Sequence, residues 1–338
     1  MATNRQVILK RRPSGVPKPE DFAMSEAPLA PLKEGEVRIR NRLFSMEPAI
    51  RGWLDDKESY FPPIALGAPI RAPSLGVVVE SRHPQYSKGE YVRGLNHWEE
   101  FSVINDNTIL LAKVHPSSSV PLSYYVGVLS GSGLSAYVGL HDIGRIQEGN
   151  TVVISAAVGA VGGTAGQIAR LRGCHVVGLV GSEEKARVAT EQLGFHAAIN
   201  YRAVNDLSAA VRDACPKGVD VYFDNVGGAT LDAMLLTMNV QGRIVSCGMI
   251  AGYNQQDQPP PIYNLWEMVA RQLEMKGFLL PAYGASIPAA QAQLEKWIAS
   301  GELKALENKR FGLESAGPLF CDLMAGKTIG KTLLELKE

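Results

Sequence analysis

The stretch T-V-V-I-S-A-A-V-G-A-V-G-G-T-A-G, residues 151–166, decides the fold. It opens with a β-branched run at 151–155, typical of a buried strand, and a helical stretch from about Gly162 to Arg172 follows. By composition, the glycine-rich part fits a flexible linker, a small-residue helix face or a loop that lets a phosphate approach the backbone. The strand before it and the helix after it are the context that a dinucleotide-binding fingerprint requires. We therefore expect a pyrophosphate loop here.

The pattern within this loop is Ala156-x-x-Gly159-x-x-Gly162, in which alanine replaces the first glycine of the fingerprint. Gly159 would permit a tight turn and a close backbone approach, and Gly162 and Gly163 would let the helix pack against the strand. The start of the helix would present unpaired N–H groups and a positive dipole end to the pyrophosphate. The expected loop contacts are Ala156, Gly159, Ala160, Val161 and Gly162.

Strands and helices alternate through the middle of the chain. A helix over 182–194 has a serine N-cap, acids in its first turn and a glycine stop, and further helices are expected near 206–214 and 229–238. The strand candidates between the helices are 175–180, 197–200, 219–226, 242–248 and 275–280. Such alternation predicts an α/β fold with βαβ units and a doubly wound, Rossmann-type parallel sheet covered by helices on both faces.

The two ends of the chain have a different pattern. Residues 1–120 are rich in proline, glycine and short strands and have no helical periodicity. The strand candidates in the two ends are 6–10, 36–45, 74–81, 90–94, 99–104 and 331–336. A β-rich domain built from both ends, residues 1–122 and 302–338, with the doubly wound domain 123–301 inserted between them, accounts for this pattern.

The charge and cysteine content exclude several classes of protein. The chain has 34 basic and 34 acidic residues, and a zero net charge argues against a partner that is a nucleic acid or an anionic membrane. No apolar stretch approaches the roughly 18 residues that span a bilayer, and the N-terminus has no apolar segment of a secretory signal. The four scattered cysteines fit free thiols in a reducing compartment. We therefore expect a cytoplasmic protein.

The end of the strand candidate at 175–180, the second strand of the doubly wound domain, indicates whether the cofactor's ribose carries a 2′-OH or a 2′-phosphate. NAD-binding folds usually carry an acid there, which bonds the ribose 2′-OH. This chain has Gly181 at that tip, and Lys185 follows one helical turn later. A missing acid and a nearby cation suit a 2′-phosphate, so the sequence favours NADPH. Glu183 and Glu184 also lie close, and stabilisation of the first helical turn is the simpler role for them.

Motifs along nearly the whole chain carry a resemblance to a known family. They are S-M-E-P-A-I-R-G-W (45–53), S-Y-F-P-P-I-A-L-G-A-P-I (59–70), G-L-S-A-Y-V-G-L (133–140), S-A-A-V-G-A-V-G (155–162), G-S-E-E-K (181–185), N-Y (200–201), D-N-V-G-G (224–228), S-C-G-M-I-A-G-Y-N (246–254), K-G-F-L-L (276–280) and G-K-T-I-G-K-T (326–332). In this order they resemble the zinc-independent medium-chain dehydrogenase/reductases. The most similar group contains leukotriene B4 dehydrogenase, prostaglandin reductase, the plant double-bond reductases and curcumin-reductase-like enzymes.

The resemblance implies a Rossmann domain and a GroES-like β-rich domain, together with NADPH-dependent reduction of the C=C bond in α,β-unsaturated ketones and aldehydes. Lys185 then resembles the ligand of the 2′-phosphate, with Gly181 and Ser182 beside it, and Tyr201 resembles the residue beside the adenine ribose-phosphate. The residues that would line the diphosphate and the nicotinamide ribose are Asn225, Ser246, Cys247 and Gly248.

Other matches concern the reacting end of the cofactor. Phe278 and Leu280 resemble the segment whose backbone meets the nicotinamide, and Thr328 occupies a place that asparagine often holds. Tyr253 matches a tyrosine near the substrate carbonyl and the ribose 2′-OH, although a structural tyrosine lining the cleft is an alternative. Tyr60 matches a tyrosine of the substrate pocket, and its alternative is a packed aromatic turn in Y-F-P-P.

The chain departs from the family pattern at a few positions. Where relatives often read D-P-Y-M-R, it has Glu47-Pro48-Ala49-Ile50-Arg51, and loss of the aromatic residue after proline would enlarge the pocket. Ser132 stands where relatives tend to have proline or threonine. Arg51 has two interpretations, a partner for a substrate carboxylate and a structural ion pair with Glu47.

Zinc alcohol dehydrogenases share the expected architecture, so a metal has to be considered. Catalytic zinc needs three protein ligands, commonly cysteine and histidine. No cysteine occurs before Cys174, and the place where zinc relatives carry Gly-His-Glu reads Ser74-Leu75-Gly76. His83, His97 and His115 are scattered. We expect no metal.

Without a metal, conjugate reduction is a better fit than alcohol oxidation, because an enolate oxygen asks for less stabilisation than an alkoxide. The Tyr253 hydroxyl and a ribose hydroxyl are the expected donors to that oxygen, and the α-carbon would take its proton from Tyr253 or from water. Two alternatives stay open: an NADPH quinone oxidoreductase of the same superfamily, and a non-catalytic NADPH-binding structural or sensor protein. A homodimer is also expected, because the strand at 275–280 would lie at a sheet edge.

Overall fold

The structure is a computed structural model that describes residues 3–57, 59–255, 258 and 260–337. The chain forms two compact units, of which the first comprises Met1–Gly127 with Glu307–Glu338 and the second Val128–Leu306. The divisions lie five residues after the expected boundaries at 122 and 301.

The second unit is built on a six-stranded parallel sheet with the order β10-β9-β8-β11-β12-β13. Its strands are β8 (Thr151–Ser155), β9 (His175–Val180), β10 (Ala197–Asn200), β11 (Val219–Asp224), β12 (Met238–Ser246) and β13 (Glu274–Gly277). The first strand lies in the middle, so the order reverses between β8 and β11. Sheets of this kind bind ligands at the carboxyl ends of the two strands that flank the reversal. The predicted Rossmann-type sheet is confirmed.

The helices of this unit largely follow the predicted alternation. They are α2 (Gly131–Val138), the π-helical η3 (Gly139–Ile143), α3 (Ala160–Leu171), α4 (Glu183–Arg187), the π-helical η4 (Val188–Gln192), α5 (Leu207–Ala214), α6 (Gly228–Leu235), α7 (Ile250–Tyr253), α8 (Glu267–Ala270), the 3₁₀ segment η5 (Leu280–Ser286) and α9 (Ile287–Ala299). α3 begins at Ala160, two residues before the expected start. α2, α7, α8 and α9 are additional to the predicted helices.

Two successive residues of β11 show that helices cover both faces of the sheet. Tyr222 belongs to a buried cluster with Leu231 and Met234 of α6. Phe223, the next residue, faces the opposite way, because a β-carbon added to Gly139 would stand 2.6 Å from its ring. Successive side chains of a strand point to opposite faces, so each face buries its own apolar layer.

The first unit is β-rich and contains two sheets. β1 (Thr3–Leu9) and β2 (Phe22–Pro28) form an antiparallel pair. The larger, seven-stranded sheet contains β3 (Val37–Ser45), β4 (Arg71–Ser81), β5 (Tyr91–His97), β6 (Phe101–Ile104), β7 (Ala112–Val114), β14 (Glu307–Phe311) and β15 (Lys331–Glu335). Short helices complete the unit: η1 (Pro19–Asp21), α1 (Ile50–Trp53), η2 (Leu122–Val126), η6 (Leu313–Ser315) and α10 (Ala316–Met324).

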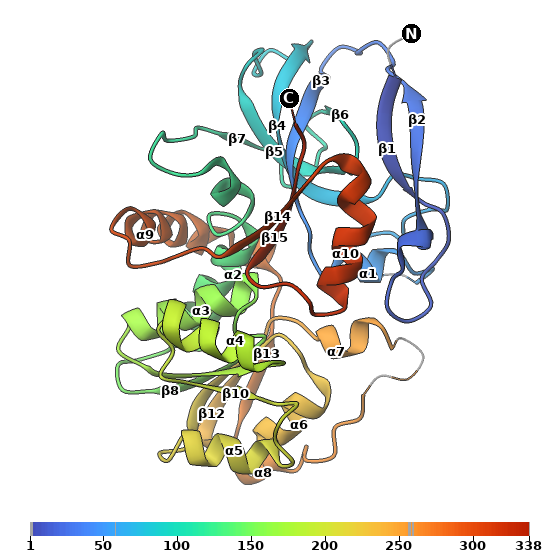
Figure 1. The fold of residues 1–338 in the computed structure, drawn as a ribbon. Coiled ribbons are helices and arrows are strands. Elements are labelled where there is room, and N and C mark those ends of the chain that lie inside the picture. The colour runs from blue at the N-terminus through green and yellow to red at the C-terminus, as the bar shows by residue number, and fades with distance from the viewer. Residues whose placement is uncertain (1–2, 58, 256–257, 259, 338) are drawn as a thin grey trace. The chain divides into compact units, whose positions relative to one another are not determined.

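Strands from the two chain ends share the larger sheet. β15 pairs antiparallel with β3, where Leu333 lies opposite Ser45, and β14 pairs parallel with β15. Figure 1 shows the C-terminal strand in red running alongside the blue N-terminal ones. Alternate residues of β3, including Val37 and Ile39, are fully buried against Val78 of β4 and form the core.

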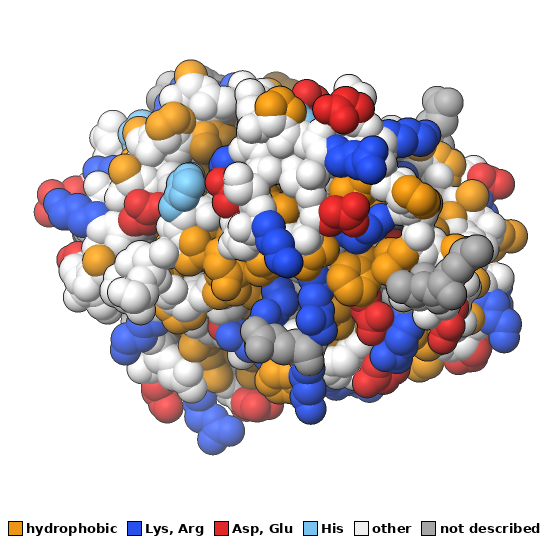
Figure 2. All heavy atoms as spheres, turned by 90° about the horizontal axis from the view of Figure 1, so that it is seen from above, with side chains coloured by type: hydrophobic (Ala, Val, Ile, Leu, Met, Phe, Trp, Pro, Cys, Tyr) orange, Lys and Arg blue, Asp and Glu red, His pale blue; other side chains and the backbone are white. Residues whose placement is uncertain are grey.

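The described residues include no helix long and apolar enough to cross a membrane. Acidic and basic side chains occur together on the face drawn in Figure 2, in keeping with the zero net charge of the sequence.

Candidate functional site

The loop after β8 turns at Ala156, whose φ of 50° lies in the left-handed region. An L residue in that region is strained by about 1–2 kcal/mol, which is why glycine usually holds this fingerprint position. Gly162 leaves no room for a side chain, since a β-carbon there would stand 2.4 Å from the Ala156 carbonyl oxygen. A β-carbon on Gly163 would stand 3.2 Å from the side chain of Leu193. Gly162 thus lets α3 pack on the turn, whereas Gly163 faces a neighbouring segment.

The first turn of α3 offers backbone donors next to this loop. Gly159 is the N-cap, and the first i to i−4 bond runs from the Gly163 N–H to the Gly159 carbonyl over 2.8 Å. The N–H groups of Ala160, Val161 and Gly162 therefore have no acceptor within the helix. Together with the positive end of the helix dipole they suit a phosphate.

Gly181, at the end of β9, is backed by the loop that follows β10. A β-carbon on Gly181 would stand 3.0 Å from the Tyr201 hydroxyl and 3.6 Å from Nε of Arg202. Lys185 is half-buried on α4, and burial and the positive charge of Arg202 lower its pKa. Ser182 caps α4 by accepting a hydrogen bond from the Lys185 N–H at 3.2 Å. The predicted residues thus meet around Gly181, together with Arg202, which was not predicted.

Glu183, the acid nearest to Gly181, already has a partner. Its carboxylate accepts a hydrogen bond of 2.8 Å from Nδ2 of Asn200. The oxygen of the same amide accepts a bond from the Arg202 N–H at 3.2 Å. Glu183 therefore ties the end of β10 to the start of α4, a structural role beyond stabilisation of the first turn.

Asp224, at the end of β11, organises the loop on the other side of the reversal in strand order and was not predicted as a site residue. Its side chain is fully buried, and Oδ1 accepts from the N–H groups of Val226 and Gly227, each at 2.9 Å. Oδ1 also accepts from the hydroxyls of Tyr222 at 2.7 Å and Ser155 at 3.2 Å. Burial raises the pKa of Asp224, and these hydrogen bonds oppose the rise.

Asn225 continues this network towards β8. Its backbone N–H donates to the Ser155 hydroxyl and its Nδ2 to the Ser155 carbonyl, both at 2.8 Å. The N–H groups of Cys247 and Gly248, after β12, donate to the Asp224 carbonyl at 2.8 and 3.1 Å. Those two N–H groups are therefore engaged and do not donate to a ligand. Ser246 ends β12 beside them.

Tyr253 lies against the same segment. Its hydroxyl oxygen accepts a hydrogen bond from the Met249 N–H at 3.4 Å and stands 3.5 Å from where a Gly248 β-carbon would be. The described residues provide no acceptor for its phenolic proton. Burial raises the pKa of Tyr253, so the hydroxyl stays protonated at neutral pH and can donate a hydrogen bond. In the structure, Tyr253 thus lies beside the Ser246–Gly248 segment, which was also predicted to belong to the site.

Phe278 and Leu280 directly follow β13, at the same carboxyl edge of the sheet. Both are half-buried, and the Phe278 ring packs edge-on against Tyr283 with centroids 5.9 Å apart. Loops from all six strands of the second unit thus contribute predicted site residues at one edge of the sheet.

Tyr60 belongs to the first unit, in an aromatic cluster beside α1. Its ring meets Trp53 edge-on at 6.2 Å and Phe61 at 5.2 Å, and the guanidinium of Arg71 stands 5.8 Å from the centre of the Phe61 ring. With 54% of its surface exposed, Tyr60 is both part of a packed aromatic turn and accessible to a ligand. Thr328 lies half-buried between α10 and β15 of the same unit.

Both interpretations of Arg51 are wrong. Its guanidinium is 2% exposed, pairs with Asp55 at 2.6 Å and donates to the backbone carbonyls of Pro13 and Gly15. Glu47 instead pairs with Lys331 at 3.2 Å. Arg51 and Asp55 are four residues apart across α1, a helix that the all-β pattern did not indicate.

Comparisons with known proteins agree with this architecture. A family described as the N-terminal domain of oxidoreductase matches residues 5–111, and one described as zinc-binding dehydrogenase matches residues 160–298. The NADPH-dependent curcumin reductase of Escherichia coli (strain K12) is 37% identical over 98% of this chain and 97% of its own. The chain belongs to the medium-chain dehydrogenase/reductase family. It lies in the curcumin-reductase-like group.

Two further members of this medium-chain family are similar over their whole lengths. The 2-alkenal reductase (NADP(+)-dependent) of Nicotiana tabacum is 39% identical, with 98% of this chain and 97% of the other covered. A crystal structure of CurA in complex with NADPH from Vibrio vulnificus superposes with a TM-score of 0.92 at 33% identity, covering 99% of each chain.

Leu75 is the residue that matches the histidine in the Gly-His-Glu of zinc relatives, and it is fully buried. The residue before it is Ser74. It is 1% exposed, donates to Oδ1 of Asn41 at 2.8 Å and accepts from Nδ2 of Asn96 at 2.9 Å. The matching position thus has an apolar side chain, next to a buried hydroxyl that is already hydrogen-bonded. Residues 3–57, 59–255, 258 and 260–337 contain no group of three or more His, Cys, Asp or Glu side chains that could hold a metal ion.

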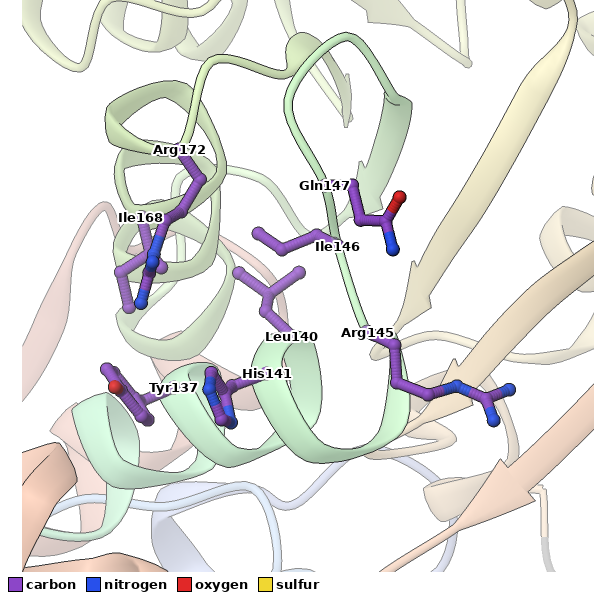
Figure 3. A pocket seen from close by; sticks show the side chains of 8 residues that line it. All are labelled: Tyr137, Leu140, His141, Arg145, Ile146, Gln147, Ile168 and Arg172. Atoms are coloured by element: carbon purple, nitrogen blue, oxygen red, sulfur yellow. The ribbon is translucent and has the colours of Figure 1, made fainter.

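A small cavity of about 260 Å³ lies elsewhere in the second unit. Figure 3 shows Tyr137 and His141 side by side on the consecutive helical segments α2 and η3, and their rings stack with centroids 5.5 Å apart. The lining residues Arg145 and Arg172 precede β8 and β9, so the cavity lies toward the amino ends of these strands, away from the loops described above. We assign it no part in the reaction.

Proposed function

We propose that this member of the medium-chain family uses NADPH to reduce the C=C bond of α,β-unsaturated ketones and aldehydes. The observation that carries the proposal is the arrangement of Gly181, Lys185 and Tyr201 at the 2′ position together with a protonated Tyr253 beside the Ser246–Gly248 segment. The names of the relatives, a curcumin reductase and a 2-alkenal reductase, support the same reaction class.

The residues around the crevice fit a dinucleotide. Gly162 keeps the turn after β8 open to close approach, and the free N–H groups of Ala160 and Val161 suit the pyrophosphate. Lys185 offers a positive charge one helical turn after Gly181, the position where NAD-specific folds carry an acid. We further propose that Asn225, Ser246 and Cys247 line the nicotinamide ribose, and that the backbone of Phe278 and Leu280 meets the nicotinamide.

Bound NADPH supplies the hydride that reduces the β-carbon. Negative charge then collects on the carbonyl oxygen of the substrate, and the Tyr253 hydroxyl is positioned to donate a hydrogen bond to that oxygen. Because burial raises its pKa, Tyr253 is better suited to stabilising the enolate than to giving up its proton. The proton on the α-carbon then comes from water or from Tyr253 as a general acid.

We propose that the reaction is independent of zinc, since Leu75, which has no metal-binding atom, matches the histidine of zinc relatives and the neighbouring Ser74 hydroxyl is engaged by Asn41 and Asn96. We also propose that the first unit, with Tyr60, binds the substrate and the second unit binds NADPH. Thr328 would contact the cofactor from the first unit. A reducing cytoplasm suits the four free thiols, and we propose it as the location.

The purified protein can be tested with NADPH or NADH and a panel of an aliphatic enone, the matching saturated ketone, an enal and a quinone. We expect oxidation of NADPH with the enone and the enal, and a saturated ketone as the identified product. Turnover of the quinone alone would favour the quinone oxidoreductase alternative. Binding of NADPH with no turnover of any activated alkene would favour a non-catalytic binding protein.

We propose a homodimer formed through the edge strand β13. All four of its residues are exposed, and the preceding helix α8 follows Trp266, which is 70% exposed. An uncovered edge with apolar neighbours invites pairing with a second copy about a two-fold axis. Sedimentation analysis should give a dimer for the wild type and a smaller species for Met275→Pro, because proline lacks a backbone N–H and disrupts strand pairing. A monomeric wild type would refute the dimer.

A further inference from the structure

Arg202 is an exposed arginine next to the 2′ subsite, and neither the fold nor the reaction described above uses it. It follows Tyr201 in the loop after β10, and its guanidinium lies over the Tyr201 ring, 5.8 Å from the ring centre. In the part of the chain that the structure describes, no carboxylate pairs with this guanidinium. An arginine held on an aromatic face without an anionic partner is available for a ligand.

The backbone around Arg202 is held in place. The Tyr201 N–H donates to the Val180 carbonyl at 3.0 Å, and the Arg202 N–H donates to Oδ1 of Asn200 at 3.2 Å. Asn200 is bonded in turn to Glu183 at the start of α4. The guanidinium therefore projects from a loop that two strands and a helix position.

The guanidinium of Arg202 lies beside Gly181. A β-carbon at this position would stand 3.6 Å from Nε of Arg202 and 3.0 Å from the Tyr201 hydroxyl. This is the strand tip where NAD-specific folds carry an acid that bonds the ribose 2′-OH. Arg202 thus lies beside the space into which such an acid would project, where the 2′ substituent of a bound dinucleotide is expected.

Lys185 adds a second positive charge to the same place. The charge of Arg202, acting together with burial, lowers the pKa of Lys185, so the two cations are close enough to repel each other. A dianionic phosphate between them would relieve that repulsion, and the planar guanidinium offers paired donors that match phosphate oxygens.

We propose that Arg202 binds the 2′-phosphate as a second cation beside Lys185 and sets the preference for NADPH over NADH. This inference rests on the proposed cofactor site. The competing role for the same side chain is stacking on the adenine ring. Adenine is common to both dinucleotides, so stacking would affect NADPH and NADH equally, whereas a phosphate contact affects NADPH alone.

The test measures the Kd of NADPH, NADH, 2′,5′-ADP and 5′-AMP for the wild type, R202Q, R202K and R202M. Glutamine keeps hydrogen-bond donors without the charge, lysine keeps the charge, and methionine keeps an apolar contact with Tyr201 should R202Q be poorly folded. R172Q is the matched control, because Arg172 is an exposed arginine of the same unit that precedes β9, at the opposite ends of the strands.

Loss of one charge-assisted contact should weaken NADPH and 2′,5′-ADP about tenfold or more in R202Q and R202M. NADH and 5′-AMP should change less than about twofold, R202K should lie between, and R172Q should match the wild type. Equal losses for NADPH and NADH, or an unchanged NADPH Kd in R202Q, would overturn the proposal. A wild type that binds NADH as tightly as NADPH would overturn the NADPH assignment itself, and the inference with it.

Discussion

The hydroxyl of Ser155, the last residue of β8, lies 3.2 Å from Oδ1 of Asp224, the last residue of β11. This contact joins the two strands between which the sheet order reverses. The same carboxylate oxygen holds the N–H groups of Val226 and Gly227, and the Asp224 carbonyl holds the segment after β12. One buried acid thus shapes two of the loops proposed to line the cofactor.

Replacement of Asp224 by alanine should loosen these loops. The Tyr222 hydroxyl and two backbone N–H groups would lose their acceptor in a buried place, at about 1–3 kcal/mol each before relaxation. We expect a loss of stability of roughly 3 kcal/mol or more and weaker NADPH binding. Denaturant unfolding and titration with NADPH measure the two effects. Asp224→Asn, which keeps one acceptor oxygen, should recover part of both. Wild-type affinity in Asp224→Ala would contradict the positioning role.

Tyr253→Phe should slow the reaction while the cofactor remains bound. Loss of a donor to the developing enolate lowers kcat by about 10²- to 10³-fold by analogy with oxyanion-hole donors. The Kd of NADPH should change little, because the hydroxyl makes only a 3.4 Å contact with Met249. Tyr263→Phe is the matched control, since Tyr263 is 81% exposed and its hydrogen bond to Asp232 comes from the backbone. An unchanged kcat in Tyr253→Phe would remove this tyrosine from the mechanism.

The pH dependence of kcat follows from the same hydroxyl. Burial raises the pKa of Tyr253 above its usual value of 10.0, so the donating, neutral form persists at all lower pH values. The alkaline decline due to Tyr253 should therefore lie above pH 10, and Tyr253→Phe should abolish it. A decline well below pH 10 that disappears in Tyr253→Phe would mean that the side chain ionises more easily than its burial implies.

The Glu47–Lys331 pair should make the first unit sensitive to acid. Burial acts to raise the pKa of Glu47, but Lys331 and the Ser45 hydroxyl outweigh it and lower the pKa below 4.5. A depressed pKa in the folded state gives stability that is present above pH 4.5 and lost as the pH falls through the folded value. Glu47→Gln should therefore destabilise most near neutral pH, and its difference from the wild type should shrink on acidification. A difference independent of pH, measured by thermal unfolding across this range, would exclude the ion pair as its cause.

The turn at Ala156 predicts opposite effects for two small substitutions. Ala156→Gly relieves the left-handed strain but adds freedom to the unfolded chain, for a net gain of about 0.5–1 kcal/mol. Gly162→Ala would place a β-carbon 2.4 Å from the Ala156 carbonyl and should cost both stability and NADPH affinity. Unfolding curves of the two variants test the pair, and a harmless Gly162→Ala would show that the turn can shift.

The sequence predicts the helices and strands of this fold well where the segment has a clear apolar pattern or a recognisable helix cap. The strand expected at 197–200 is β10 itself, and the serine cap expected at 182 is present in α4. β2, β7 and β14 lack such a pattern, and these strands depend on pairing with distant segments for their formation. Propensity along the chain carries little information about partners so far away.

The site is predictable to the extent that its residues lie in motifs at strand ends. Lys185 could be placed in this way, because it follows the tip of a parallel strand and the carboxyl ends of such strands share one edge of the sheet. Tyr253 was expected only from its match to the family motif. Asp224 could not, since its importance lies in hydrogen bonds from loops that meet only in the folded state. Arg51 shows the same limit: its partner Asp55 is four residues away, but only the formation of α1 brings the two together.

The pairing of β15 with β3 also bears on the order in which the chain can fold as it is synthesised. All residues of the second unit emerge from the ribosome before β15, so that unit can fold while translation continues. The first 127 residues are made earlier, yet their larger sheet lacks β15 until Glu335 has been added. Until then the end of β3 at Leu43–Ser45 lacks a neighbour on one edge, and a chain truncated before Lys331 should be more sensitive to limited proteolysis in the first unit than in the second.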